Sequence, residues 1–248
     1  MTRIPKNHPR YKSLMTREKI SLAMKKGLVH ETGLIAHGRG EAFDYLIGEK
    51  TQPFAEMAEK IAAALLLYAK NPVISLNGNV VALSAKECIS LSNAVPAKLE
   101  VNLFHRTNER VKKIIDNLKS IGAKEVYGFN ANAYIPGLNH DRGLCEKDSI
   151  YSADTVLVPL EDGDRCQALR NMGKIVITID LNPLSRTSKT ANVTIVDNVI
   201  RAIPTIEKWI KVLKRNDKSE LNSLIDTWDN EKMLKEVLFF ISRRLQDL

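Results

Sequence analysis

Short apolar runs alternate with helix-like stretches from residue 72 to about residue 200. The apolar runs, rich in β-branched residues, occupy residues 73–76, 99–104, 125–129, 155–159, 174–179 and 193–196. Stretches of helical composition lie between most of them, notably at 80–93, 107–121 and 164–172. Strand–helix–strand repetition with strands that are apolar on both faces is typical of a mainly parallel sheet covered by helices. The pattern therefore predicts an α/β fold with a doubly wound, Rossmann-like sheet.

The two ends of the chain carry other patterns. Residues 16–26 are helix formers followed by Gly27, a helix stop. The next stretch, 27–40, is too rich in glycine for a regular element and too apolar for a solvated linker, so we expect an ordered, partly buried loop. Pro53 opens a helix rich in alanine and leucine that ends near Asn71. From about residue 202 the chain is helical again, with a polar interruption at 214–219.

A length of 248 residues suits one large α/β domain with a helical addition. We expect residues 1–204 to form the α/β domain, including the N-terminal helices and the glycine-rich loop. Residues 205–248 then form a C-terminal helical appendage, used for packing or for dimer formation.

Hydropathy and cysteine usage indicate a cytoplasmic protein. The longest apolar run, 61–67, is far shorter than the ~20 residues of a membrane-spanning helix, so we expect no membrane partner. The basic N-terminus lacks the apolar stretch of a secretory signal. Three widely spaced cysteines, Cys88, Cys145 and Cys166, are odd in number, which favours reduced thiols over disulfides or a zinc site.

The net charge of +8 has two possible causes. A diffuse basic surface attracts nucleic acid, whereas a few arginines held in loops attract a small phosphorylated ligand. Nucleic-acid surfaces interleave aromatic residues for stacking, and aromatic residues make up only 6% of this chain. We therefore expect no nucleic-acid partner, although a basic nucleic-acid-binding protein stays open as an alternative.

Polar loops follow nearly every predicted strand. They occupy residues 77–79, 105–107, 130–132, 161–165, 180–187 and 197–198. Any one such loop is better explained as a turn or helix cap, because Asn, Asp and Gly dominate turns. Six together favour a ligand site, since ligands of open parallel sheets bind beyond the carboxyl ends of the strands.

The residue types in these loops suit a polyphosphate and a metal ion. Arginines offer forked donors to phosphate, and glycines let backbone N–H groups come close. Mg²⁺ prefers one or two carboxylates together with substrate phosphates. The candidates are Arg39, Arg106, Arg165, Arg186, Gly38 and Gly40 for phosphate, and Asp162, Asp164, Asp180 and Asp197 for Mg²⁺, and we expect Asp162 and Asp164 to be the metal pair. Capping of the following helix explains Asp162 and Asp164 equally well.

Several familiar motifs are absent from the sequence. There is no P-loop, and Phe43 stands where a dinucleotide fingerprint at 38–43 needs a small residue. No Gly-x-Ser-x-Gly elbow occurs, and no cysteine neighbours a histidine. His30 and His37 are better explained as loop histidines that orient the backbone than as general bases. A sugar-phosphate isomerase or kinase on the same fold stays open.

Longer stretches of sequence allow a more specific comparison with known families than these short motifs do. They are IPKNHPRY at 4–11, GLVHETGLIAHGRGEAFDY at 27–45, NGN at 77–79, NLFHRT at 102–107, VPLEDGDR at 158–165, IDLNPLSRT at 179–187 and IVDNV at 195–199. In this order they resemble the archaeal phosphopantothenate synthetase family, the 4-phosphopantoate:β-alanine ligases of coenzyme A biosynthesis. The resemblance spans residues 4 to about 204, and the C-terminal helices add nothing to it.

The resemblance implies a homodimeric, AMP-forming ligase with ATP as co-substrate, and the carboxylates named above add Mg²⁺ as the expected cofactor. Such an enzyme joins the carboxylate of 4-phosphopantoate to the amine of β-alanine and releases AMP and pyrophosphate. Attack of the carboxylate on the α-phosphorus of ATP would give an acyl adenylate and these products, and an acyl phosphate stays open as the alternative intermediate. The ATP-binding positions that it implies are Arg17, Arg39, Asp180, Leu181, Asn182, Arg186, Thr187, Asp197 and Asn198.

The residues themselves suggest how the work is divided. Arg17, Arg39 and Arg186 with Mg²⁺ would stabilise charge on the α-phosphate and pyrophosphate. His37 is the candidate that accepts a proton from β-alanine, and Arg39 is the catalytic cation beside it. The 4-phosphopantoate phosphate is expected at Asn77, Gly78, Asn79, His105, Arg106, Thr107 and Arg165.

Overall fold

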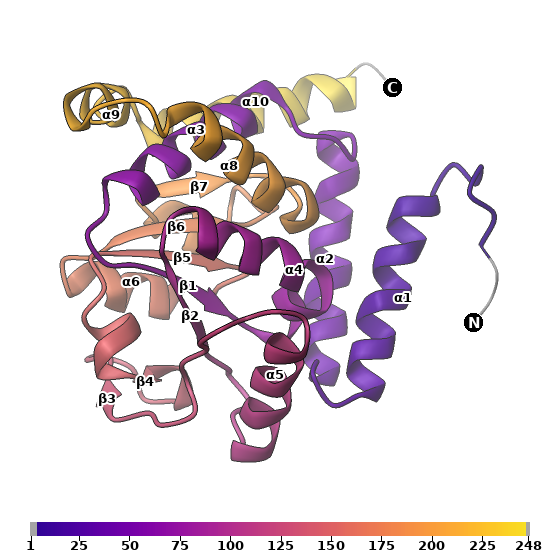
Figure 1. Cartoon of the computed structure of the whole chain (residues 1–248). Coiled ribbons are helices and arrows are strands. Elements are labelled where there is room, and N and C mark those ends of the chain that lie inside the picture. Colours follow the sequence, from indigo (N-terminus) through magenta and orange to yellow (C-terminus); the bar gives the residue numbers. More distant parts are fainter. Residues whose placement is uncertain (1–3, 247–248) are drawn as a thin grey trace.

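A computed structural model describes residues 4–246 (Figure 1). Residues 1–3 and 247–248, the outer ends of the two predicted units, lie outside the described residues. The helices are α1 (Tyr11–Lys25), α2 (Glu31–Ile47), α3 (Pro53–Tyr68), α4 (Gly78–Ala94), α5 (Asn108–Ser120), α6 (Gly163–Asn171), α7 (Arg186–Thr190), α8 (Val199–Leu213), α9 (Lys218–Ile225) and α10 (Asn230–Gln246). The strands are β1 (Pro72–Leu76), β2 (Lys98–Val101), β3 (Ala133–Tyr134), β4 (Leu144–Cys145), β5 (Thr155–Pro159), β6 (Ile175–Ile179) and β7 (Val193–Ile195).

A five-stranded parallel sheet forms the centre of the molecule, in the order β2-β1-β5-β6-β7. The predicted doubly wound, Rossmann-like α/β fold is confirmed. Strand β1 pairs with β2 on one side and with β5 on the other, and Ile74 faces Leu99 and Leu157 in these two ladders. The strand order therefore reverses between β1 and β5, and such a reversal opens a crevice beyond the strand ends.

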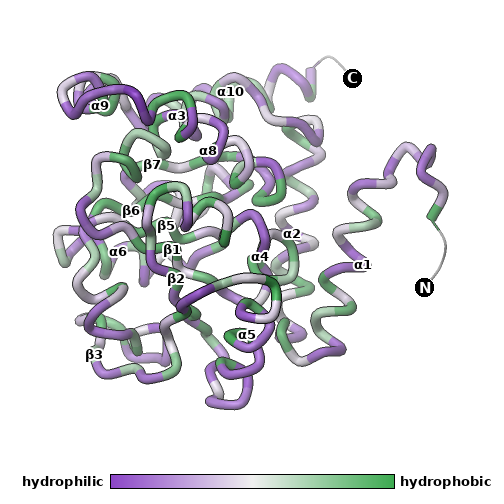
Figure 2. Tube along the Cα trace, viewed as in Figure 1, coloured by the Kyte–Doolittle hydropathy of each residue, from purple (hydrophilic) through white to green (hydrophobic). Residues whose placement is uncertain are grey.

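Side chains of alternate residues on the central strands pack into two different hydrophobic cores. Ile74, Leu157 and Ile177 belong to the cluster under α3, α4, α5 and α8. Val73 and Val156, one position earlier on β1 and β5, belong to the cluster that α6 and residues 133–153 cover. Because side chains alternate across a strand, helices on both faces are needed to bury these runs. Figure 2 shows the hydrophobic colour concentrated along the central strands.

The predicted strand at 125–129 is wrong. Only an isolated parallel bridge between Glu100 and Tyr127 forms there. Gly128 takes φ +113°, and its α-carbon lies against the carbonyl of Val101, where any side chain would collide. This left-handed turn ends the pairing after one residue, so β2 stays the edge of the sheet.

The predicted glycine-rich loop at 27–40 is also wrong, because Glu31 begins helix α2. His30 caps the helix through its Nδ1, which accepts the Thr32 N–H at 3.3 Å. Gly33 lets α2 press against the start of α4, where the Asn79 amide donates to the Gly33 carbonyl at 2.8 Å. The glycines thus serve close helix packing, at the cost of intrinsic helix propensity.

The predicted helices at both ends are present. Helix α1 covers 16–25, α3 begins at Pro53, and the tail contains α8, α9 and α10 with a polar break near 214–217. The boundary expected after residue 204 falls inside α8, which packs on α3 and α4. Helix α10 packs on α2, α3 and α7. The expected boundary therefore lies within one continuous helix.

Cys88, Cys145 and Cys166 are free and buried, as expected. Burial raises the pKa of Cys145 and of Cys166 to about 12. Among residues 4–246, no helix combines the length and the apolar character that crossing a membrane requires.

Candidate active site

A cavity of about 440 Å³ lies where the five parallel strands end, under α2. Figure 1 shows β7 pointing toward α2, which stands across the strand ends beside α1. The residues that line the cavity follow the order of the strands, from Phe104 and His105 after β2 to Asn198 and Val199 after β7. A cavity of this size suits a small-molecule ligand.

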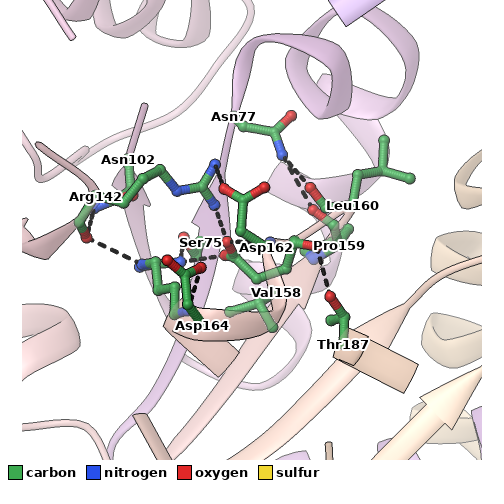
Figure 3. Close-up of polar contacts among 12 residues, drawn as sticks. Ser75, Asn77, Asn102, Arg142, Val158, Pro159, Leu160, Asp162, Asp164 and Thr187 are labelled. Carbon is green, nitrogen blue, oxygen red and sulfur yellow. Dashed lines mark hydrogen bonds and ion pairs between the residues drawn. The ribbon is translucent and has the colours of Figure 1, made fainter. Parts of the chain in front are cut away.

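Asn77 joins the two strands on either side of the strand-order reversal. Its side-chain oxygen accepts the Val80 N–H at 3.1 Å and so caps α4. Its amide donates to the carbonyls of Pro159 (3.2 Å) and Leu160 (3.0 Å), which follow β5 (Figure 3). Leu160 takes φ +55°, which is rare for a residue with a side chain. The ends of β1 and β5 are therefore fixed to each other at the middle of the cavity.

A buried ion network lies just behind this junction. The Glu161 carboxylate pairs with the guanidinium groups of Arg142 and Arg165, and all three side chains are at most 5% exposed. Burial alone would raise the pKa of Glu161, but Arg142 and Arg165 lower it below the usual value. Arg165 also donates to the Arg142 carbonyl (3.2 Å) and to Ser75 (3.3 Å). The Arg142 guanidinium is thus held in one position at the cavity wall.

Asp162 lines the cavity beside Arg142. Its Oδ2 lies 3.5 Å from an Arg142 nitrogen, and its carboxylate makes no hydrogen bond within residues 4–246. Burial raises the pKa of Asp162, although Arg142 acts in the opposite sense. Asp162 is therefore a carboxylate with free acceptor capacity in the cavity.

Helix α2 supplies the opposite wall. Burial lowers the pKa of His37, so its imidazole is neutral at pH 7. Arg39 also lines the cavity and makes no hydrogen bond or ion pair within residues 4–246. Glu41 accepts two hydrogen bonds from the Arg17 Nε and Nη2 atoms (2.9 and 2.7 Å) and one from Ser13 (2.8 Å).

The β2 end of the cavity is cationic and aromatic. The rings of His30 and His105 stack with centroids 3.8 Å apart. Arg110, one turn into α5, donates to the carbonyls of His105 (2.6 Å) and Leu28 (3.1 Å). Burial is the main cause that lowers the pKa of His30, and electrostatic repulsion by its neighbours His105 and Arg110 lowers it further. This end is suited to an anion, which would remove the repulsion.

Comparison with known proteins points to one family. The family profile described as "Phosphopantothenate/pantothenate synthetase" matches residues 54–244. A 4-phosphopantoate--beta-alanine ligase of Thermococcus onnurineus is 53% identical over 249 residues, covering 100% of this chain and 95% of that protein. The proteins of that name from Methanosarcina mazei (53% over 248 residues) and Methanospirillum hungatei (55% over 242) cover 98% or more of both partners. This chain belongs to the phosphopantothenate/pantothenate synthetase family. The resemblance predicted from the motifs is confirmed.

About half of the predicted site residues of this synthetase family member meet in the cavity. They are His37, Arg39, Asn77, Gly78, Asn79, His105, Asp162, Leu181 and Asn198. Their individual roles stay predictions. The residues predicted for the 4-phosphopantoate phosphate follow β1 and β2, whereas Leu181 and Asn198 of the predicted ATP site follow β6 and β7. In the order of the strands, these two predicted subsites therefore lie toward opposite ends of one cavity.

The other predicted residues have different partners. Arg17 reaches the cavity only through Glu41, and Arg106 donates to the Gly128 carbonyl (2.6 Å). Thr107 caps α5, and Thr187 donates to the Glu161 carbonyl (2.8 Å). The side-chain oxygens of Asp180, Asn182 and Asp197 accept hydrogen bonds from the backbone N–H groups of Asn182, Leu184 and Asn198, respectively. Arg186 lies along Gly163, exposed and without a hydrogen bond in the described residues.

Two predicted phosphate contacts do not fit the structure. Arg165 is fully buried and bonded to Glu161, so it supports the site from behind. Gly38 and Gly40 lie inside α2, where backbone N–H groups are used by the helix itself. The sequence did not reveal that residues 31–40 are helical, and the expectation for Gly38 and Gly40 rested on a loop at this place.

The pair Asp162 and Asp164 does not fit a metal site well. The Asp164 oxygens accept from His140 (2.8 Å) and from the Arg165 N–H (2.8 Å). Arg142 is beside Asp162. Within residues 4–246 no three His, Cys, Asp or Glu side chains are grouped as metal ligands. Donors thus occupy both Asp164 oxygens, and a cation lies beside Asp162.

Sequence reasoning missed several residues that line the cavity, among them the basic side chains of His30, Arg110 and Arg142. His30 was interpreted as a loop histidine, although a cap position before Glu31 was visible. Arg110 follows the cap residue Thr107 by one turn, which places it on the cavity side. Arg142 lies in an irregular segment with short elements at Ala133–Tyr134 and Leu144–Cys145, and no periodicity indicates its direction.

Proposed function

We propose that this chain is an ATP-dependent ligase of coenzyme A biosynthesis. It joins the carboxylate of 4-phosphopantoate to the amine of β-alanine, forms 4'-phosphopantothenate and releases AMP and pyrophosphate. The observation that carries the proposal is full-length identity above 50% to proteins named 4-phosphopantoate--beta-alanine ligase. The cavity across all five strand ends is consistent with it.

The chemistry requires an activated carboxylate. In this proposal the 4-phosphopantoate carboxylate attacks the α-phosphorus of ATP and displaces pyrophosphate, giving an acyl adenylate. The β-alanine amine then attacks the acyl carbon, and AMP leaves. Cations must stabilise the negative charge that develops on the phosphates. Arg39 and Arg186 are supported in this role because neither guanidinium group has a hydrogen bond or ion pair within residues 4–246.

The two anionic substrates divide the cavity between them. The phosphate of 4-phosphopantoate lies at the β1 and β2 ends, among Asn79, His105 and the newly found His30 and Arg110. ATP lies toward Leu181 and Asn198 at the β6 and β7 ends. The 4-phosphopantoate carboxylate then points to the middle. Positioning of this kind supplies a large part of the rate gain in such reactions.

His37 stays the proposed acceptor of a proton from β-alanine, and its lowered pKa leaves it neutral and able to accept. Mg²⁺ is proposed as the ion that accompanies the ATP phosphates and neutralises them. Asp162 and Asp164 are poor ligands for it in the arrangement described above.

A homodimer is also proposed. The outer face of α2 leaves Ile35 70% and Tyr45 41% exposed, and large exposed apolar side chains favour a contact surface. Ile35→Glu should shift the mass measured by light scattering from dimer to monomer. An unchanged dimer would place the contact elsewhere.

Product analysis tests the reaction. Incubation with ATP, 4-phosphopantoate and β-alanine should yield AMP and pyrophosphate in equal amounts, with both acid and amine required for full turnover. ADP would indicate an acyl phosphate instead. Turnover of a sugar phosphate without nucleotide use would favour an isomerase.

A further inference from the structure

The amine substrate poses a recognition problem that the proposed function leaves open, and the inference below rests on that function. β-Alanine is a zwitterion at neutral pH, so its ammonium group must find a negative partner inside a cavity that otherwise serves anions. An acidic side chain in the lining is the protein group that offsets such a charge most strongly, and an unpaired buried ammonium is costly.

Two acidic residues line the cavity among residues 4–246, Glu41 and Asp162. Glu41 is already neutralised by Arg17, with which it forms a two-bond ion pair, and it also accepts from Ser13. Asp162 has no hydrogen bond to its carboxylate, and its buried Oδ2 has only the Arg142 nitrogen at 3.5 Å. Asp162 is thus the lining carboxylate that can accept a new donor.

Asp162 also lies at the right place along the cavity. It follows β5, the central strand of the order β2-β1-β5-β6-β7. The proposed 4-phosphopantoate phosphate lies on the β2 side and ATP on the β6 side, so the activated carbonyl lies between them. An amine held at Asp162 is therefore beside the carbon that it must attack.

The surrounding charges hold Asp162 in position. Glu161 is fixed between Arg142 and Arg165, and its own N-terminal neighbour Leu160 is tied to Asn77. The Asp162 N–H donates to the Glu161 carboxylate at 2.7 Å. Arg142 stands beside Asp162, with its Nη1 atom 3.5 Å from the Asp162 Oδ2 atom (Figure 3).

We propose that Asp162 is the subsite for the ammonium group of β-alanine, and that Arg142, through its ion pair with Glu161, is the residue that positions it. The ligand class is a short ω-amino acid with a free primary ammonium. Neither the family description nor the names of the relatives assigns this contact.

Asp162→Asn tests the proposal because it removes the charge and keeps the shape. The KM for β-alanine should rise about tenfold to a hundredfold, the loss expected for one charge-assisted hydrogen bond. The rate of pyrophosphate exchange into ATP, measured with 4-phosphopantoate and without β-alanine, should stay close to the rate in the unmodified enzyme. Hydroxylamine, which is uncharged at neutral pH, should trap the acyl group equally well in both proteins.

The matched control is Asp141→Asn, which changes an exposed aspartate next to Arg142 that makes no side-chain hydrogen bond or ion pair in the described residues. It should leave the β-alanine KM unchanged. Asp162→Glu, which moves the carboxylate by one methylene, should raise the β-alanine KM and spare the exchange reaction.

Three results would overturn the assignment. One is an unchanged β-alanine KM in Asp162→Asn. The second is loss of exchange together with β-alanine turnover, which would place Asp162 in the first half-reaction. The third is recovery of Asp162→Asn by high Mg²⁺ alone, which would make it a metal ligand. Failure of the unmodified enzyme to form AMP would instead overturn the proposed function.

Discussion

Arg201 on α8 donates hydrogen bonds to both carboxylate oxygens of Asp44 on α2, at 3.2 and 2.6 Å. The amide of Asn198 donates to the same carboxylate at 2.8 Å. Helix α2, which carries His37 and Arg39, is therefore fixed to the end of β7, and a predicted ATP residue shares the attachment.

Asp44→Asn should weaken both the fold and ATP binding. The substitution removes one of the two carboxylates that pair with Arg201 and leaves the other, Asp197, in place, so we expect a loss of about 1.5–3 kcal/mol in the free energy of unfolding. The KM for ATP should rise because the amide of Asn198 then donates to a neutral acceptor instead of a carboxylate, which weakens the contact that positions it. Urea unfolding and steady-state kinetics measure the two effects. Glu231→Gln, in an exposed pair with Lys235, is the control that should change neither.

Glu161→Gln should destabilise the protein by about 3 kcal/mol, because two buried guanidinium groups lose their carboxylate. The pH dependence has a defined sign. The pKa of Glu161 is lowered in the folded state, so its contribution is present above its ordinary pKa and is lost as the pH falls through the folded value. Thermal melts between pH 3 and 7 should show a shallower acid limb in the variant. An equally steep limb would contradict this account.

Glu59→Gln should act in the opposite pH range. Burial and the carboxylates of Asp197 and Glu56 raise the pKa of Glu59 to about 9. The folded chain keeps this proton while the unfolded chain releases it, so stability falls as the pH rises from about 4.5 to about 9. The amide cannot ionise, and the variant should be more stable by about 2 kcal/mol or more at pH 9. Melting temperatures at pH 5 and pH 9 give the comparison; equal slopes in both proteins would refute the assignment.

Gly33→Ala and Gly38→Ala form a matched pair on α2. A Cβ at Gly33 would collide with the Asn79 side chain, so we expect a loss of about 1–3 kcal/mol and reduced turnover. A Cβ at Gly38 meets nothing within 4 Å, and alanine there should stabilise the helix by about 0.5–1 kcal/mol. Chemical denaturation distinguishes the two. Equal effects at both positions would argue against the packing role of Gly33.

Arg186→Ala should reduce kcat/KM for ATP at least tenfold without changing the melting temperature. The side chain is exposed and has no hydrogen bond in the described residues, so the fold does not depend on it. A charge-assisted contact to phosphate is worth about 1.5–3 kcal/mol, which corresponds to this factor. Retained activity would remove Arg186 from the ATP site.

The sequence predicted the central sheet well, because five β-branched runs are buried on both faces and alternate with helices. Failures came where local composition and tertiary packing disagree. Glycines at 33, 38 and 40 indicated a loop, yet the contact between Gly33 and Asn79 requires a helix with no side chain at that point. The run 125–129 has strand composition, but Gly128 turns it away from β2 after one bridge.

The strand-end rule found the cavity but could not separate its lining from its support. Arg165 and Asp162 belong to the same loop, yet the helical turn between them sends one inward and leaves the other in the cavity. Arg142 comes from a segment without periodic pattern, and only the folded chain brings it to Glu161. Such contacts between distant segments carry no local signal in one sequence.

The chemical reactivity of the three buried thiols can report on unfolding of the chain. Cys88, Cys145 and Cys166 are each fully covered, and Cys145 and Cys166 are almost wholly protonated at neutral pH. A maleimide or disulfide reagent needs an accessible thiolate, so labelling has to wait for the core to open. Because Cys88 lies in the core beneath α4 and the other two lie on the opposite side of the sheet, the order in which they react would tell which half of the molecule opens first.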